Sequence, residues 1–396
     1  MALFKGKVDS RGLAEFAQRL VRIPSVSGQE GDLAKALAAE LDAVGCDEVR
    51  IDGLGNVIGR LGSGEGPVLL LEGHMDTVDV SDPASWSRPP FSGEISGGML
   101  YGRGAADMKG GLAAMTHALK TLAESKTRLR GTCYLVGVVQ EEPCEGMAIQ
   151  HVIEGEGLRP DWVVLGEPTN LQIARGHRGR IALEITVRGR ASHASMPQQG
   201  VNAIYQAARV VVGVELLAAQ LGEDSFLGKG SIAVTDMRSI AGSRNAVPDA
   251  CTLYLDRRLT GGETEAKAIA EIRSIVSREG VDASIRVDEY QATTYTGVGV
   301  TARQEYAAWA TSANHPLVAT ASSVIERTLG YLPRVTRWEF STDGVYTAGV
   351  AGLPTIGFGP GEERYAHTSD EQVRVQDLQA AAQVYAELAR RLVGAD

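Results

Sequence analysis

The sequence has 396 residues, of which 44% are hydrophobic and 22% are charged, and its formal net charge is −10. These values exclude a disordered or collagen-like chain and indicate a globular protein of two or three domains, at about 150 residues per domain. The negative charge argues against a nucleic-acid partner, and no apolar stretch approaches the roughly 18 residues that a membrane span needs. We therefore expect neither nucleic acid nor a membrane as a partner.

The cysteines and the N-terminal segment bear on the cellular compartment. The cysteines are widely spaced and form no CxxC pair, which argues against a zinc ribbon or a disulfide scaffold. They are Cys46, Cys133, Cys144 and Cys251. The first twelve residues, MALFKGKVDSRG, lack the apolar core of a signal peptide. Together these features predict a cytoplasmic protein with reduced thiols.

The first part of the chain predicts an α/β domain. Helical periodicity and short apolar runs alternate along it. The predicted helices are 11–22, 31–44, 108–123 and a segment near 145–154, and the predicted strands are 68–71, 133–139 and 162–165. Strands that alternate with helices of this length predict a mostly parallel central sheet flanked by helices.

After residue 180 the order of predicted elements changes to βαββαβ, the order of a ferredoxin-like unit. These elements are 181–187, 201–221, 231–240, 251–258, 263–278 and 283–287. The α/β pattern then resumes with a helix at 317–329, a strand at 354–358 and a helix at 376–392. We predict a catalytic domain from residues 1–179 and 295–396, with a second domain, residues 180–294, inserted into it.

Polar side chains that bind metals gather where the predicted strands end. Open α/β sheets place their functional sites beyond the carboxyl ends of the strands. In this sequence those positions hold His74, Asp76, Glu141, Glu142 and Glu167; Asp107 opens a helix, and His367 follows a late glycine-rich loop. Imidazole mixed with carboxylate is the ligand combination that suits zinc.

Each of these residues also has an ordinary structural explanation. A lone histidine after a strand is usually structural, Asp107 could be a helix N-cap, and adjacent glutamates usually form a solvated turn. Their joint occurrence at several strand ends favours a metal site. The other histidines have no partner pattern, and we interpret them as structural; they are His117, His151, His177 and His315.

Five motifs together resemble the di-zinc aminoacylase/carboxypeptidase family, which includes acetylornithine deacetylase, succinyl-diaminopimelate desuccinylase and glutamate carboxypeptidase. They are GHMDTV, GRGAADMKGG, the EEP triplet, GEPT and AHTSDE. The resemblance covers nearly the whole chain. Further segments are similar to the YgeY-type hydrolase subgroup of that family: RGHRGR, FLGKG, DRRLTGGET, WEFSTDGV and IGFGPGEE.

The resemblance implies a role for each residue of the strand-end group. Asp107 would bridge two zinc ions, with cobalt or manganese as alternatives, and the peptide bond after it would be cis. His74 and Glu167 would complete one metal site, and Glu142 and His367 the other. Glu141 would be the general base, and Asp76 would orient His74 through its second ring nitrogen.

A second set of residues is implied to bind substrate. His193 would donate to the developing oxyanion, often in the partner subunit's site, and Asn245 would contact the substrate. Arg258 would bind a substrate carboxylate, with Arg257 as a competing candidate and a surface salt bridge as the ordinary alternative. Ser341 and Thr342 resemble a substrate loop, although an ordinary turn is the alternative. The inserted domain would form a homodimer, and a tetramer is not excluded.

The resulting hypothesis is a metal-dependent amidohydrolase that cleaves the amide bond of N-acyl amino acids. Its small-molecule substrate would carry a free carboxylate, and two zinc ions would activate a water molecule for attack with Glu141 as base. A dipeptidase or carboxypeptidase with the same site is the alternative, and N-carbamoyl hydrolysis is less favoured. A non-catalytic relative would lack ligands that are present here, and a nucleotide-binding protein would need a phosphate loop that the sequence lacks.

Overall fold

The computed structural model describes residues 6–62, 65–125 and 128–394, so the first five residues of the N-terminal segment discussed above lie outside it. Within this part the main sheet has nine strands, with β6, β3, β7 and β20 parallel at its centre and antiparallel strands toward both edges. In spatial order they are β1 (Glu48–Ile51), β2 (Val57–Gly62), β6 (Thr132–Val138), β3 (Val68–His74), β7 (Trp162–Leu165), β20 (Thr355–Gly357), β8 (Ile173–His177) and β18 (Trp309–Ala310), and β19 (Val335–Trp338) also pairs with β8. Only the central strands are continuous apolar runs, as buried parallel strands usually are.

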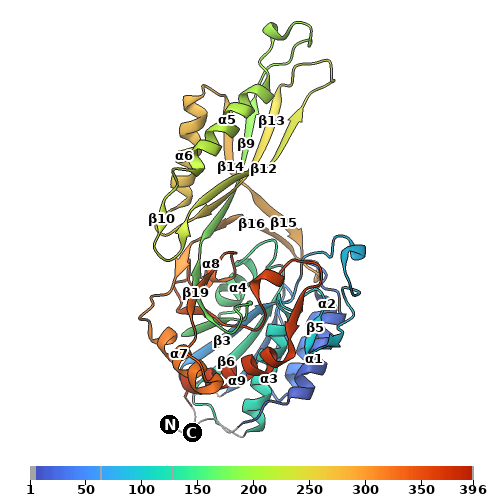
Figure 1. Cartoon of the computed structure of the whole chain (residues 1–396), viewed down its shortest axis with the longest axis vertical. Coiled ribbons are helices and arrows are strands. Elements are labelled where there is room, and N and C mark those ends of the chain that lie inside the picture. The colour runs from blue at the N-terminus through green and yellow to red at the C-terminus, as the bar shows by residue number, and fades with distance from the viewer. Residues whose placement is uncertain (1–5, 63–64, 126–127, 395–396) are drawn as a thin grey trace.

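Helices pack beside one another against the main sheet (Figure 1). They are α1 (Ser10–Arg22), α2 (Gly31–Ala43), α3 (Lys109–Glu124), α7 (Pro316–Leu329) and α9 (Val375–Leu392), together with the short α4 (Met147–Gln150) and α8 (Gly344–Thr347). In α1 the Asp9 carboxylate accepts a hydrogen bond from the Gly12 N–H, and the buried residues recur at helical spacing from Leu13 to Val21. The segment predicted as a helix near 145–154 begins only after Gly146, whose φ of 82° is left-handed, and continues as π-helix over His151–Gly155.

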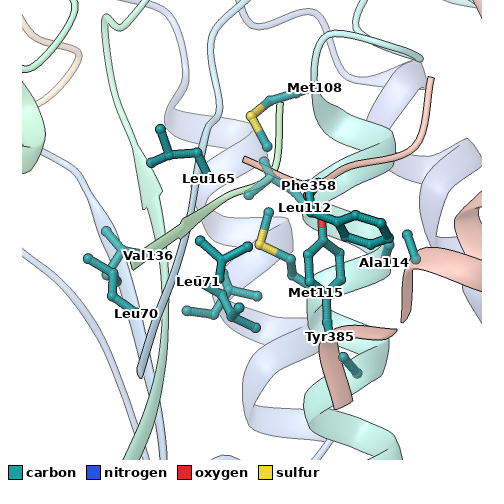
Figure 2. Close-up of a cluster of buried hydrophobic side chains, with 14 of the residues drawn as sticks. Leu70, Leu71, Met108, Leu112, Ala114, Met115, Val136, Leu165, Phe358 and Tyr385 are labelled. Atoms are coloured by element: carbon teal, nitrogen blue, oxygen red, sulfur yellow. Dashed lines mark hydrogen bonds between the residues drawn. The ribbon is translucent and has the colours of Figure 1, made fainter. Parts of the chain in front are cut away.

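The core fixes where α3 begins relative to β3. Figure 2 shows Met115 beside Leu71 of β3, with Leu112 and then Met108 beyond them, and all four side chains are fully buried. A Cβ atom at Gly73 would lie 2.2 Å from Cε of Met108, so any larger residue at that position would have to displace this buried side chain. This close packing brings the residue before Met108 to the carboxyl end of β3.

A second sheet, which we call the inserted sheet, has its own hydrophobic core. Its strands, all antiparallel, run in the order β12 (Ser231–Ile240), β13 (Ala250–Leu259), β9 (Gly179–Arg188) and β14 (Ala283–Val287), and β17 (Glu305–Tyr306) also pairs with β9. Helices α5 (Ala203–Ala218) and α6 (Glu265–Arg278) supply apolar side chains to the same core. The element order from β9 to β14 is therefore βαββαβ, with a small ribbon between α5 and β12.

The remaining strands form small ribbons. They are β4 (Ile95–Ser96), β5 (Met99–Tyr101) and β21 (Gln372–Arg374); β10 (Glu223–Asp224) and β11 (Gly228–Lys229); and β15 (Glu289–Thr293) and β16 (Gly299–Arg303). The boundary predicted at residues 294 and 295 falls inside the β15–β16 ribbon, and we propose that the two hydrophobic cores mark the two domains. None of the helices in the described ranges is both long and apolar enough to cross a membrane.

Candidate metal centre

Two histidines and four carboxylates meet at the carboxyl ends of the central strands. His74 ends β3, Asp107 precedes α3, and the loops after β6, β7 and β20 supply the others. They are His74, Asp107, Glu141, Glu142, Glu167 and His367. Potential ligand atoms of His74, Asp107 and Glu142 lie within 4.8 Å of one another, and so do those of His74, Glu141 and Glu167. The parallel sheet therefore brings together side chains that are up to 293 positions apart in the sequence, because strand ends on one edge are neighbours.

The Asp107 carboxylate lies between the two histidines. Its Oδ1 is 2.9 Å from His74 Nε2, and its Oδ2 is 3.4 Å from His367 Nε2. Each histidine also has a glutamate neighbour. Glu142 Oε2 lies 2.8 Å from His367 Nε2, and Glu167 Oε1 lies 3.6 Å from His74 Nε2. The peptide bond between Asp107 and Met108 is cis, as the family resemblance implies. This geometry gives each carboxylate oxygen of Asp107 a separate histidine partner.

The group is buried except for His367, whose side chain is 53% exposed. One carboxylate oxygen each of Glu141, Glu142 and Glu167 is buried and has no hydrogen-bond partner among the described residues. Burial raises the pKa of the Glu141 and Glu167 carboxyl groups well above the usual value. Burial alone would lower the pKa of His74, but the negative charge of Glu167 and the hydrogen bond to Asp107 raise it well above normal. Buried, unpaired carboxylate oxygens of this kind call for cations, and the mixed imidazole and carboxylate donors fit divalent metal ions.

Asp76 contacts this group in a way that the sequence did not reveal. His74 Nδ1 lies 2.9 Å from the backbone oxygen of Asp76 and 3.7 Å from its carboxylate Oδ1. The carboxylate itself accepts hydrogen bonds from the backbone N–H groups of Glu141 at 3.0 Å and Glu142 at 3.2 Å, and from the Ser27 hydroxyl at 2.7 Å. Asp76 therefore holds the imidazole through its backbone and the two glutamates through its side chain.

Another buried carboxylate, Glu371, supports the loop that ends in Asp107. It accepts hydrogen bonds from the backbone N–H groups of Gly104 at 3.0 Å and of Ala106 and Asp107 at 2.9 Å each. Its Oε2 is also 2.8 Å from a guanidinium nitrogen of Arg103. We missed this residue in the sequence, although it stands at the end of the AHTSDE motif.

A cavity of about 390 Å³ opens above the candidate metal ligands. Its lining combines metal-group residues with two arginines from the inserted sheet and residues of the main sheet's loops. Besides the metal group, the lining includes Glu145, Arg180, Arg258, Phe340, Ser341, Glu363 and Ala366. Of the predicted substrate residues, Arg258 and Ser341 therefore face this cavity. Arg180, the last residue of the RGHRGR segment, does so too, although the sequence assigned it no role.

Thr342 is fully buried, outside the cavity, against His177. His177 Nε2 accepts hydrogen bonds from the Thr342 backbone N–H at 3.0 Å and from the Trp309 indole N–H at 2.8 Å. Burial lowers the pKa of His177 to about 4, so the ring is neutral at pH 7. This histidine fixes the loop that carries Ser341, which agrees with the structural role that we expected for it.

His193 and Asn245 lie together, away from the metal group. The Asn245 backbone oxygen accepts a hydrogen bond from the Ala194 N–H at 2.8 Å, and both residues are exposed in loops at the far end of the inserted sheet (Figure 1). Arg180 lies at the start of β9 and His193 follows its other end, and the ten residues of the strand span about 30 Å. Within one chain, the structure does not bring His193 or Asn245 to the cavity.

Comparison with known proteins identifies the family. Residues 70–391 match the model of peptidase family M20/M25/M40. The chain is 36% identical over 386 residues to the uncharacterized protein YgeY of Escherichia coli (strain K12), covering 98% of this chain and 96% of that protein. It is 29% identical over 386 residues to succinyl-diaminopimelate desuccinylase of Stenotrophomonas maltophilia (strain K279a), covering 94% and 97% of the two chains.

Solved structures share the fold over nearly the whole length. A tripeptidase from Staphylococcus aureus has a TM-score of 0.78 at 22% identity, with 98% of this chain and 100% of that chain covered. The Bacillus subtilis YXEP protein, described as a dinuclear metal-binding peptidase of family M20, has a TM-score of 0.71 at 17% identity, with 97% and 98% covered. The chain thus belongs to peptidase family M20/M25/M40 and is a metal-dependent hydrolase of amide or peptide bonds.

Proposed function

We propose that this hydrolase removes the acyl group from N-acyl amino acids with the help of two zinc ions. The observation that carries the proposal is the position of Asp107 between two histidines, each with its own glutamate neighbour. Similarity to a desuccinylase over nearly the whole chain supports an acyl substrate. The more distant likeness to a tripeptidase concerns the fold, so peptide cleavage is kept as an outcome of the test.

Five of the six residues divide into two ligand sets that share Asp107. His74 and Glu167 would hold one zinc ion, and Glu142 and His367 would hold the other. The mixture of imidazole and carboxylate suits zinc, and cobalt or manganese could take the same positions. When bound, two such ions lower the pKa of a water molecule and polarise the scissile carbonyl.

Glu141 is the general base in this proposal. Its backbone is held by Asp76, while its Oε1 atom is buried and has no partner within the described part of the chain. This carboxylate is therefore free to take a proton from the attacking water and to deliver it to the leaving amine. Arg258 would hold the carboxylate of the amino acid through its guanidinium group.

His193 and Asn245 would act from a second copy of the chain. Both are exposed on the inserted sheet, beyond the reach of their own metal group. A homodimer formed through the inserted domain could bring them to the partner's cavity, where His193 would donate a hydrogen bond to the developing oxyanion. Tetramers would be built from the same dimers.

The test is hydrolysis of a mixed pool followed by mass spectrometry. The pool contains N-acetyl, N-succinyl, N-formyl and N-carbamoyl amino acids and dipeptides, and zinc-loaded protein is run beside Glu141→Gln. We expect the wild type to consume N-acyl amino acids, and the variant to bind zinc but to be slower by about 10²–10⁴-fold. Consumption of dipeptides alone, or equal activity of the two proteins, would overturn the proposal.

A further inference from the structure

Two arginines face each other across neighbouring strands above the candidate metal centre. Arg180 of β9 pairs directly with Arg258 of β13 in the antiparallel register, and both side chains line the cavity. Directly opposite residues on antiparallel strands lie on the same face, with Cβ atoms about 4.5–5.5 Å apart. Like charges in this position destabilise a sheet unless nearby anionic groups offset them.

Protein groups accept hydrogen bonds from only some of the N–H donors of the two guanidinium groups. Arg258 Nε donates to Asp256 Oδ1 at 2.8 Å, and its two terminal nitrogens donate to no residue in the described ranges. Arg180 Nε is buried and has no hydrogen-bond partner in the described part of the chain, and one terminal nitrogen lies 3.5 Å from Glu145 Oε2. The Arg180 guanidinium is also held 4.7 Å above the Tyr306 ring. Donors that could hold a planar anion therefore remain on both arginines.

The acidic groups that line the cavity outside the metal group have other partners. Glu145 Oε1 accepts a hydrogen bond from the Ser341 hydroxyl, and Glu363 Oε1 accepts one from the Glu339 backbone N–H at 3.0 Å. Glu145 thus offsets part of the Arg180 charge, but no carboxylate is paired with both arginines in the part of the chain described by the structure. Two bound carboxylates could each make a bidentate contact with one guanidinium group, whereas a single carboxylate would have to divide its two oxygens between them.

We propose that the substrate carries two carboxylates, one held by Arg258 and the other by Arg180. This inference rests on the proposed function and narrows its substrate class to dianionic N-acyl amino acids. The second carboxylate could belong to the amino acid, as in an N-acylglutamate, or to the acyl group, as in an N-succinyl amino acid. In both cases a guanidinium group is suited to bidentate binding of a carboxylate.

Kinetics on matched substrates test the proposal. N-acetylglutamate is compared with N-acetylglutamine, and N-succinylalanine with N-butyrylalanine, so that each pair differs by one charge. For the wild type we expect, in one of the two pairs, a kcat/KM at least about tenfold higher for the dianionic substrate than for its monoanionic partner. The pair that shows this difference identifies whether the second carboxylate belongs to the amino acid or to the acyl group. Arg180→Gln should lower kcat/KM for that dianion by about 10- to 100-fold and change the other substrates by less than about threefold, while Arg180→Lys retains part of the preference.

Glu145→Gln is the matched control. If Arg180 served only to pair with Glu145, this variant and Arg180→Gln would slow monoanionic and dianionic substrates alike, and the proposal would be wrong. Equal kcat/KM values within both substrate pairs for the wild type would also overturn it.

Binding without turnover separates this inference from the proposed function. Calorimetry of the zinc-loaded protein compares glutarate with pentanoate, which has the same carbon chain and one carboxylate. We expect glutarate to bind at least about tenfold more tightly to the wild type and to lose that advantage in Arg180→Gln. If this result is found but no N-acyl amino acid is hydrolysed, the dicarboxylate site is supported and the proposed reaction fails. If N-acyl amino acids are hydrolysed without any Arg180-dependent preference, the reaction is supported and the dicarboxylate site fails.

Discussion

Replacing the Asp76 carboxylate should affect one of the two proposed metal sites more than the other, because the carboxylate contacts residues of one site more closely. Its oxygens accept the backbone N–H groups of Glu141 and Glu142 at 3.0 and 3.2 Å, whereas His74 Nδ1 is 3.7 Å from the nearer oxygen. We therefore expect Asp76→Asn to weaken metal binding at the site of Glu142 and His367 more than at the site of His74 and Glu167.

The size of the effect follows from these contacts. An asparagine keeps one oxygen acceptor, but its NH₂ group faces a backbone N–H, so about one charge-assisted hydrogen bond is lost. Such a bond contributes about 1.5–3 kcal/mol, which corresponds to roughly 10- to 150-fold in metal affinity. That range agrees with the usual cost of removing a group that orients a ligand.

The assay is a zinc titration of the metal-free protein that resolves two binding steps. Glu142→Gln and Glu167→Gln identify which step belongs to which site, and Ser27→Ala removes the third partner of the Asp76 carboxylate as a milder control. Unfolding followed by circular dichroism shows whether each variant is folded. If Asp76→Asn weakens the step assigned by Glu167→Gln instead, the carboxylate acts through His74 and our reasoning is wrong.

Three further predictions concern other parts of the molecule. Mixing His193→Ala with Glu141→Gln subunits should restore activity that neither variant has alone, because one site of the mixed dimer would then hold both intact residues. If activity is not restored, His193 does not act across subunits. His177→Ala should lower the free energy of unfolding by about 2–5 kcal/mol, since it leaves two buried N–H donors without an acceptor, and a loss below about 1 kcal/mol in urea unfolding would contradict this. Burial, with the nearby Asp76 charge, raises the pKa of Glu30 to about 7. The folded state therefore binds this proton more tightly than the unfolded state, and the protein loses stability as the pH rises from 5 to 8. Glu30→Gln should flatten that pH dependence by an amount on the order of 3 kcal/mol in denaturant unfolding, and an unchanged slope would contradict the assignment.

Much of the architecture could be predicted because the pattern of apolar residues is local. Strand β12 and strand β14 have the predicted bounds, Ser231–Ile240 and Ala283–Val287, since alternation and flanking polar residues define both ends. The candidate metal group could also be predicted, because the strand-end rule places side chains by topology without knowledge of their contacts. Two edge strands of the main sheet were missed, since β18 and β19 are short and owe their conformation to pairing with β8, β18 antiparallel and β19 parallel.

Contacts between distant segments are what the sequence could not supply. The pairing of Arg180 with Arg258 depends on the register of two strands that are separated by a helix and another long strand. The burial of Glu371 beneath the Asp107 loop depends on a segment more than 260 positions away. In both cases the residue type is common at a protein surface, so only the three-dimensional pairing distinguishes it.

The place of β20 in the main sheet has a consequence for the newly made chain on the ribosome. β20 lies between β7 and β8, yet it is synthesised after the whole inserted sheet. Until then β7 is paired with β3 on one side only, and its other edge presents unpaired backbone groups of an apolar strand. His367 emerges later still, so the nascent chain carries the four buried carboxylates before their second histidine. The main sheet and the candidate metal group are therefore both completed only after the inserted sheet has been made.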